Sequence, residues 1–168
     1  MTRHQRILIY GYGNPGRQDD GLGAAFIAKM EDWLRQNPVP GINLDCNYQL
    51  NIEDAEHIAH KDLVVFVDAS QEDIEDYTFT AINPNDARVE FTMHAVSPAF
   101  VVDLCRKMFH RAPDAYLLHI KGYEWDFAEQ LSDAATRNLE AAFDFLTEII
   151  RNKKSFDNAI ITKQDVTH

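Results

Sequence analysis

Cysteine is scarce in this chain of 168 residues: Cys46 and Cys105 are the only two, and they form no C-x-x-C pair. A framework of several disulfides is therefore excluded. A chain of this length buries about 70% of its unfolded surface and needs no such framework. Both cysteines lie among apolar residues, so we expect two buried thiols in a reducing compartment and a cytoplasmic protein.

Long apolar runs are absent as well. No stretch approaches the roughly 18 apolar residues that a membrane-spanning helix needs. Near the N-terminus, Arg3 and Arg6 precede the apolar run Ile7–Tyr10, which is too short for the apolar region of a signal peptide. The sequence thus predicts no membrane span.

Positive charge is in short supply. The 16 Lys and Arg residues face 27 Asp and Glu residues, so the formal net charge is −11. Residues 53–76 are especially acidic and contain a single basic lysine, Lys61. Such a surface repels phosphate backbones, so we expect no nucleic-acid partner. The acidic run either serves only to keep the surface soluble or suits a basic partner or a cation.

What the sequence does contain is an alternation of short apolar runs and helical stripes. The apolar runs predict strands at residues 6–10, 42–48, 63–67, 77–82 and 115–120. The stripes predict helices at residues 20–36, after Ser97-Pro98 and after Ser132, with a short helix or turn at 52–60. We expect a single α/β domain over residues 1–152, followed by a polar, flexible tail over 153–168.

Strands that alternate with helices predict a three-layer α/β fold, in which a mostly parallel, twisted sheet is flanked by helices on both faces. The run Leu63–Val67 is unbroken, which is typical of a strand buried on both faces. In such sheets, ligands bind beyond the carboxyl ends of the strands. The candidate functional residues are therefore those that follow each strand.

A glycine-rich loop, residues 11–23, follows the first strand and formally matches the G-x-G-x-x-G spacing of dinucleotide sites. Two carboxylates, Asp19 and Asp20, stand where the helix begins and would repel a pyrophosphate there. The ribose-binding acid expected after the second strand is also missing, since Tyr48-Gln49 stands at that place. A dinucleotide site is therefore disfavoured. Helix capping and the helix dipole explain one of the two aspartates but do not require both.

Asp68 and His94 follow later in the chain. Asp68 comes directly after the apolar run 63–67, and His94 lies in the loop before the helix that begins at Ser97-Pro98. Asp68 is either a residue that caps a turn or a ligand or acid–base group that faces the crevice. His94 is either structural or a ligand. A lone histidine is a weak signal in this chain, which also contains His57, His60, His110 and His119.

Together, a carboxylate of the glycine loop, Asp68 and His94 give two carboxylates and one imidazole. This set suits a borderline divalent ion. Catalytic zinc sites usually have three protein ligands, commonly with two or more histidines. One histidine with two carboxylates would bind zinc or nickel only weakly. The set therefore makes more sense as half a site that another molecule completes.

Several motifs together resemble those of the hydrogenase maturation endopeptidases. Gly11-x-Gly13-Asn14, followed by Asp19-Asp20-Gly21-x-Gly23, is similar to the opening motif of that family. The other matching positions are Gln49-Leu50 with Glu53, Val65-Phe66-Val67-Asp68-Ala69, His94, Ile120-x-Gly122-Tyr123-Glu124 and Leu131-Ser132. The resemblance extends over roughly residues 6–150.

The resemblance implies that Asp20, Asp68 and His94 are metal ligands, and it leaves Asp20 and Asp68 as candidate catalytic groups. It implies an endopeptidase that recognises nickel in the precursor of a nickel–iron hydrogenase large subunit and removes a short C-terminal peptide. The nickel would come with the substrate, whose cysteine thiolates would complete its coordination, and would not be held permanently. Candidates for contacting the substrate from the opening loop are Gly13, Asn14 and Asp19.

One departure from the family pattern concerns residues 70–75, where many members have glycines and this chain has none. The shape of that loop, and the choice of hydrogenase, stay open. Neither Ser70 nor Ser97 stands in a G-x-S-x-G motif. Water is therefore the expected nucleophile, activated either by metal or by a carboxylate.

Two alternatives belong to other classes. Gly13-Asn14-Pro15-Gly16 also resembles the start of the peptidyl-tRNA hydrolases. That family continues with a threonine-arginine-histidine-asparagine segment, whereas this chain has Gln18-Asp19-Asp20-Gly21, and its net charge opposes RNA binding. The other alternative is a non-enzymatic module that binds a metal or a nucleotide.

Overall fold

The computed structural model describes residues 4–86 and 96–162. In this part of the chain five strands form one sheet in the order β2-β1-β3-β5-β4. The strands are β1 (Ile7–Tyr12), β2 (Ile42–Asn47), β3 (Leu63–Ser70), β4 (Tyr77–Ala81) and β5 (Asp114–Lys121). All neighbouring strands pair in parallel except β4, which runs antiparallel to β5. The predicted mostly parallel α/β sheet is confirmed.

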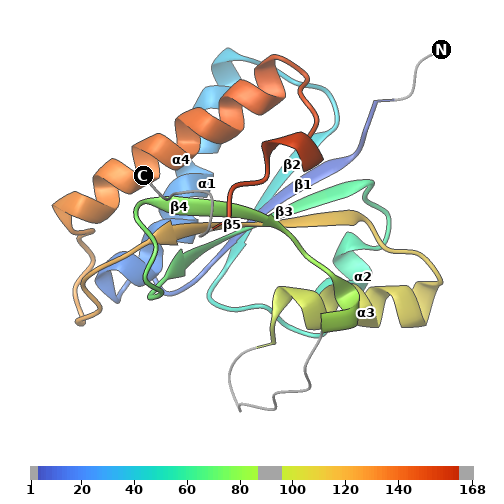
Figure 1. Ribbon diagram of the computed structural model, residues 1–168, viewed down its shortest axis with the longest axis horizontal. Coiled ribbons are helices and arrows are strands. Elements are labelled where there is room, and N and C mark those ends of the chain that lie inside the picture. Colours follow the sequence, from blue (N-terminus) through green and yellow to red (C-terminus); the bar gives the residue numbers. More distant parts are fainter. Residues whose placement is uncertain (1–3, 87–95, 163–168) are drawn as a thin grey trace.

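Helices cover both faces of the sheet (Figure 1). α1 (Leu22–Gln36) and α4 (Asp133–Arg151) pack on one face. α2 (Asp54–Ile58) and α3 (Pro98–Phe109) pack against each other on the opposite face. The described chain also has three short 3-10 helices: η1 (Gln18–Gly21), η2 (Pro84–Asp86) and η3 (Asp157–Ala159).

Two helices begin at the serines that the sequence predicts as caps. Ser97 Oγ accepts a hydrogen bond from the backbone N–H of Phe100 at 3.1 Å, and Ser132 Oγ accepts one from that of Ala135 at 3.2 Å. Each serine thereby satisfies an N–H that has no partner inside its helix. α3 leads directly into β5 and runs back along the sheet, so its N-terminus points toward the carboxyl ends of the parallel strands (Figure 1).

β3 is the centre of the core. Val65 and Val67 belong to the apolar cluster beneath α1 and α4, whereas Val64 and Phe66 belong to the cluster beneath α2 and α3. All four side chains are fully buried. Burial on both faces explains why this strand reads as an unbroken apolar run instead of an alternating one.

The C-terminal segment, predicted as a polar, flexible tail from residue 153, makes contacts with the sheet. Phe156 packs against the rings of Phe79 and Tyr116, and Ile161 exchanges backbone hydrogen bonds with Phe79 at 2.7 and 2.8 Å. Part of the segment predicted as a tail is thus joined to the sheet through Phe156 and Ile161. The physical reason is that these residues cover the outer edge of β4, whose backbone groups would otherwise be unpaired.

Cys46 departs from the prediction. It is exposed on β2, whereas Cys105 of α3 is buried as expected. β2 is an edge strand with a neighbour on one side only, and its residues are half-buried or exposed. Among the residues that the structure describes, no helix combines the length and apolar character that a membrane crossing requires.

Candidate active site

The carboxyl ends of β1 and β3 lie side by side at the middle of the sheet. β1 continues into a loop and η1, which contains Asp20, and β3 contains Asp68 near its end. The chain order reverses here, because β2 lies on one side of β1 and β3 on the other. Ligands in open α/β sheets bind at such a switch point, so Asp20 and Asp68 occupy the expected crevice.

Asp20 is held by the loop that follows β1. Its Oδ2 accepts a hydrogen bond from the backbone N–H of Asn14 at 2.9 Å. Gly13 has φ +136°, and a Cβ atom there would lie 2.1 Å from the backbone oxygen of Asp20. A side chain at this position would therefore displace the loop. Gly13 and Asn14, predicted as substrate-contacting residues, thus also shape the Asp20 carboxylate site.

Gly23 explains another part of the opening motif. A Cβ atom on Gly23 would lie 2.6 Å from the backbone oxygen of Tyr12 and 2.8 Å from that of Val67. The first turn of α1 therefore packs directly on the backbones of β1 and β3. Glycine permits this close approach, which sets η1 and its aspartates beside the end of β3.

Asp68 lies between two polar side chains from neighbouring strands. Tyr12 of β1 lies close enough for its hydroxyl and the Asp68 charge to interact. On the other side, β5 places His119 in register with Asp68, and His119 Nε2 lies 3.6 Å from Asp68 Oδ2. Burial, followed by the charge of Asp68, raises the pKa of Tyr12 well above its ordinary value, so this hydroxyl remains a donor.

The electrostatics of Asp20 bear on whether the site suits a cation. Burial raises the pKa of Asp20, and the charge of Asp68 raises it further. The Asn14 N–H and the charge of Arg17 act in the opposite direction, but the net shift is upward. Two carboxylates are thus held close enough to repel each other in a partly buried place. A divalent cation would relieve that repulsion, so these residues fit a metal ion.

Asp19 has a different role from its neighbour. It is fully buried and accepts hydrogen bonds from the backbone N–H groups of Tyr123, Glu124 and Ser132 and from the Ser132 hydroxyl, at 2.7–3.0 Å. Burial alone would raise its pKa, but these hydrogen bonds outweigh burial and lower it. Asp19, predicted as a substrate-contacting residue, thus uses its carboxylate to join η1 to the loop before α4.

His94, the third predicted ligand, lies outside the described residues. Within residues 4–86 and 96–162, no three His, Cys, Asp or Glu side chains are gathered closely enough to hold a metal ion. The structure thus brings Asp20 and Asp68 together and adds His119, which sequence reasoning treated as an isolated histidine. One feature of the sequence could have indicated His119. It is a polar residue near the end of a predicted strand, on the face that Ala115 and Leu117 bury.

Comparison with known proteins shows which solved structures share this fold. No protein-family model matches the sequence, and no curated protein matches it. Among solved structures, the [NiFe] hydrogenase maturation protease HycI from Thermococcus kodakarensis superposes with a TM-score of 0.70 at 23% identity, over 88% of this chain and 94% of that one.

Two structures from Escherichia coli are similar as well. The hydrogenase maturating endopeptidase HybD gives a TM-score of 0.70 at 16% identity, over 89% of this chain and 94% of that one. The endopeptidase HycI gives 0.67 at 15% identity, over 98% of this chain and 100% of that one. The chain therefore has the fold of the hydrogenase maturation proteases across nearly its whole length.

Proposed function

We propose that this chain is a hydrogenase maturation endopeptidase. It would remove a short C-terminal peptide from the nickel-loaded precursor of a nickel–iron hydrogenase large subunit. The observation that carries the proposal is the Asp20–Asp68 pair, held at the carboxyl edge of a fold that hydrogenase maturation proteases share. The motifs that resemble this family include both aspartates.

In this proposal the metal arrives with the substrate. Asp20, Asp68 and His94 are the proposed ligands, and thiolates of the precursor would occupy the remaining positions of the ion. Without nickel, the precursor would have nothing to share with these carboxylates. Recognition of the metal is then the step that distinguishes a loaded precursor from an empty one.

Water is the proposed nucleophile, because the described serines and thiols near the site are poorly suited. Ser70 is buried and its Oγ accepts from the N–H of Glu72, while the Ser132 hydroxyl donates to Asp19. Although the residue as a whole is exposed, partial desolvation of the Cys46 thiol and the charges of Asp45 and Glu31 raise its pKa, which favours the protonated thiol. A carboxylate such as Asp20 can instead activate a water molecule by accepting its proton.

We also propose a cytoplasmic location, supported by the free thiols of Cys46 and Cys105. The peptidyl-tRNA hydrolase alternative has less support, since aspartates stand where its catalytic segment is expected and the acidic surface repels RNA. A non-enzymatic metal-binding module differs from the proposal only in lacking cleavage.

The test mixes the purified protein with a nickel-loaded large-subunit precursor and, separately, with the nickel-free form. Mass spectrometry follows shortening of the precursor at its C-terminus. The proposal predicts cleavage of the loaded form only. Equal cleavage of both forms would contradict recognition of nickel, and stable binding without cleavage would favour the non-enzymatic module.

A further inference from the structure

A row of polar side chains crosses three adjacent strands at the carboxyl edge of the sheet. Tyr12 of β1, Asp68 of β3 and His119 of β5 all project toward the face that α2 and α3 cover, because each alternates with residues buried there. Asp68 and His119 are direct partners in the parallel register. Two strands of the rigid core, and not flexible loops, therefore fix the spacing of this carboxylate and this imidazole.

The separation of the two groups is informative. His119 Nε2 lies 3.6 Å from Asp68 Oδ2, which is longer than the about 2.7–3.2 Å of a hydrogen bond. Two ligands of one tetrahedral ion with bonds of about 2.1 Å lie about 3.4 Å apart. The observed separation is close to that value. The pair lies within ion-pair distance, and a metal ion could be accommodated between the two donors.

The two carboxylate oxygens of Asp68 have different neighbours. Asp68 Oδ1 accepts the N–H of Ala69 at 2.8 Å, whereas the distance to His119 is measured from Oδ2. Both side chains are 23% exposed, so an ion can reach them from solvent. Another histidine–carboxylate pair, His57 and Asp45, differs: it is 3.0 Å apart and more than 40% exposed, as in an ordinary surface ion pair.

We propose that His119 is a metal-binding residue of this chain, adding an imidazole to the centre at Asp68. The inference rests on the site of the proposed function, but it does not depend on proteolysis. Asp20, close enough to Asp68 for their charges to interact, would supply a third donor. Because the described donors are not gathered round one point in advance, the free protein binds a divalent ion weakly and leaves positions for a substrate.

The test is a titration of the full-length protein with Ni²⁺, followed by NMR of its histidine ring signals. The His119 signals, identified by their loss in His119→Gln, broaden before those of His57. Ni²⁺ affinity measured by calorimetry falls about tenfold or more in His119→Gln, since even changes beyond the direct ligands cost that much. The matched control His57→Gln leaves the affinity unchanged.

Three results would overturn the inference: saturable Ni²⁺ binding that leaves the His119 signals sharp, equal affinities for the wild type and His119→Gln, or no saturable binding at millimolar Ni²⁺. The ring signals are read on the unmodified protein, so an unstable variant does not spoil the test. Precursor cleavage is measured separately. A wild type that cleaves the precursor while His119 stays unaffected by Ni²⁺ would leave the proposed function standing and remove this inference alone.

Discussion

At the scale of single residues, Asp19 and Asp20 show how neighbours in sequence acquire opposite properties. Asp19 is fully buried, yet its pKa is lowered by hydrogen bonds that more than offset burial. Asp20 is half-buried, and burial together with Asp68 raises its pKa. A carboxylate with satisfied hydrogen bonds stabilises the fold, whereas one held next to another carboxylate lowers stability. That cost at Asp20 is typical of a functional group.

Replacing Asp19 by asparagine is expected to destabilise the protein by about 2–4 kcal/mol, because an amide nitrogen would face N–H donors. The folded-state pKa of Asp19 is lowered, so its contribution is present above the unfolded value and lost as pH falls through the folded value. Urea unfolding of wild type and Asp19→Asn should therefore differ at pH 7 and converge in acid. The exposed Asp133→Asn serves as the control and should change stability little.

Asp20→Asn is expected to leave stability unchanged or slightly raised at pH 7. The pKa of Asp20 is raised in the folded state, so the wild type loses stability as pH rises from the unfolded value through the folded one. The amide oxygen can still accept from Asn14, and the variant avoids the charge penalty. Thermal unfolding at several pH values tests this. A loss above about 1 kcal/mol at pH 7 would show that Asp20 is structural.

The apolar strands predicted a carboxylate of the glycine loop and Asp68 at one edge of the sheet, and the resemblance to the hydrogenase maturation endopeptidases implied Asp20. The sequence could not predict the partners of Asp19, which lie 104 to 113 residues away in the chain. Nor could it predict that His119 stands beside Asp68. That juxtaposition depends on β5 pairing with β3, and the order of strands in space is not readable from their order in sequence.

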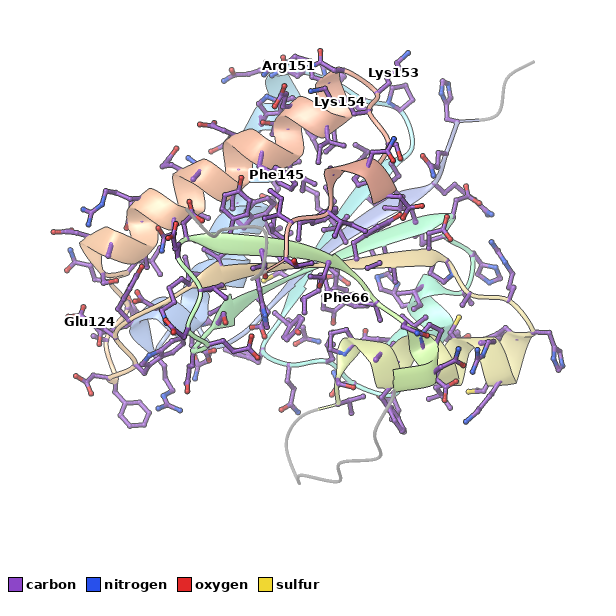
Figure 2. All side chains as sticks on the ribbon, viewed as in Figure 1. Phe66, Glu124, Phe145, Arg151, Lys153 and Lys154 are labelled. Atoms are coloured by element: carbon purple, nitrogen blue, oxygen red, sulfur yellow. The ribbon has the colours of Figure 1, made fainter. Side chains whose placement is uncertain are left out.

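At the scale of elements, β3 is the part of the fold that burial determines most completely. Figure 2 shows Phe66 between the sheet and α3, and its side chain is 0% exposed. Phe66→Ala should cost about 3–5 kcal/mol, since it removes transfer free energy and leaves a cavity. Phe127, which is 87% exposed, provides the matched control. Phe127→Ala should lower the free energy of unfolding by about 0.5 kcal/mol or less. Comparable losses in the two variants, measured by urea unfolding, would contradict this account of the core.

The elements that the sequence predicted best are those with regular periodicity. The structure places two strands, β3 and β5, within a few residues of their expected positions. The same holds for the caps of α3 and α4. The contacts of the C-terminal segment could not be predicted, because Phe156 and its apolar neighbours are sparse and show no period. Their burial depends on the edge of β4, which is distant in sequence. Cys46 was misplaced for a related reason: nothing in the run 42–48 indicates that its strand lies at an edge.

At the scale of the whole molecule, charge is unevenly placed. Figure 2 shows Glu124 at one end of the molecule, beyond the carboxyl end of β5, and Arg151, Lys153 and Lys154 together near the opposite end of α4. The candidate site thus lies at the end away from that basic group. The net charge of −11 disfavours a polyanionic substrate.

Asp20 and Asp68 are the proposed functional centre of a processing peptidase. The most direct measurement is the initial rate of C-terminal shortening of a nickel-loaded precursor by wild type, Asp68→Asn and the surface control Asp133→Asn. We predict that Asp68→Asn lowers the rate at least about 100-fold while it remains folded, and that Asp133→Asn matches the wild type. A folded Asp68→Asn that processes the precursor at the wild-type rate would contradict the account.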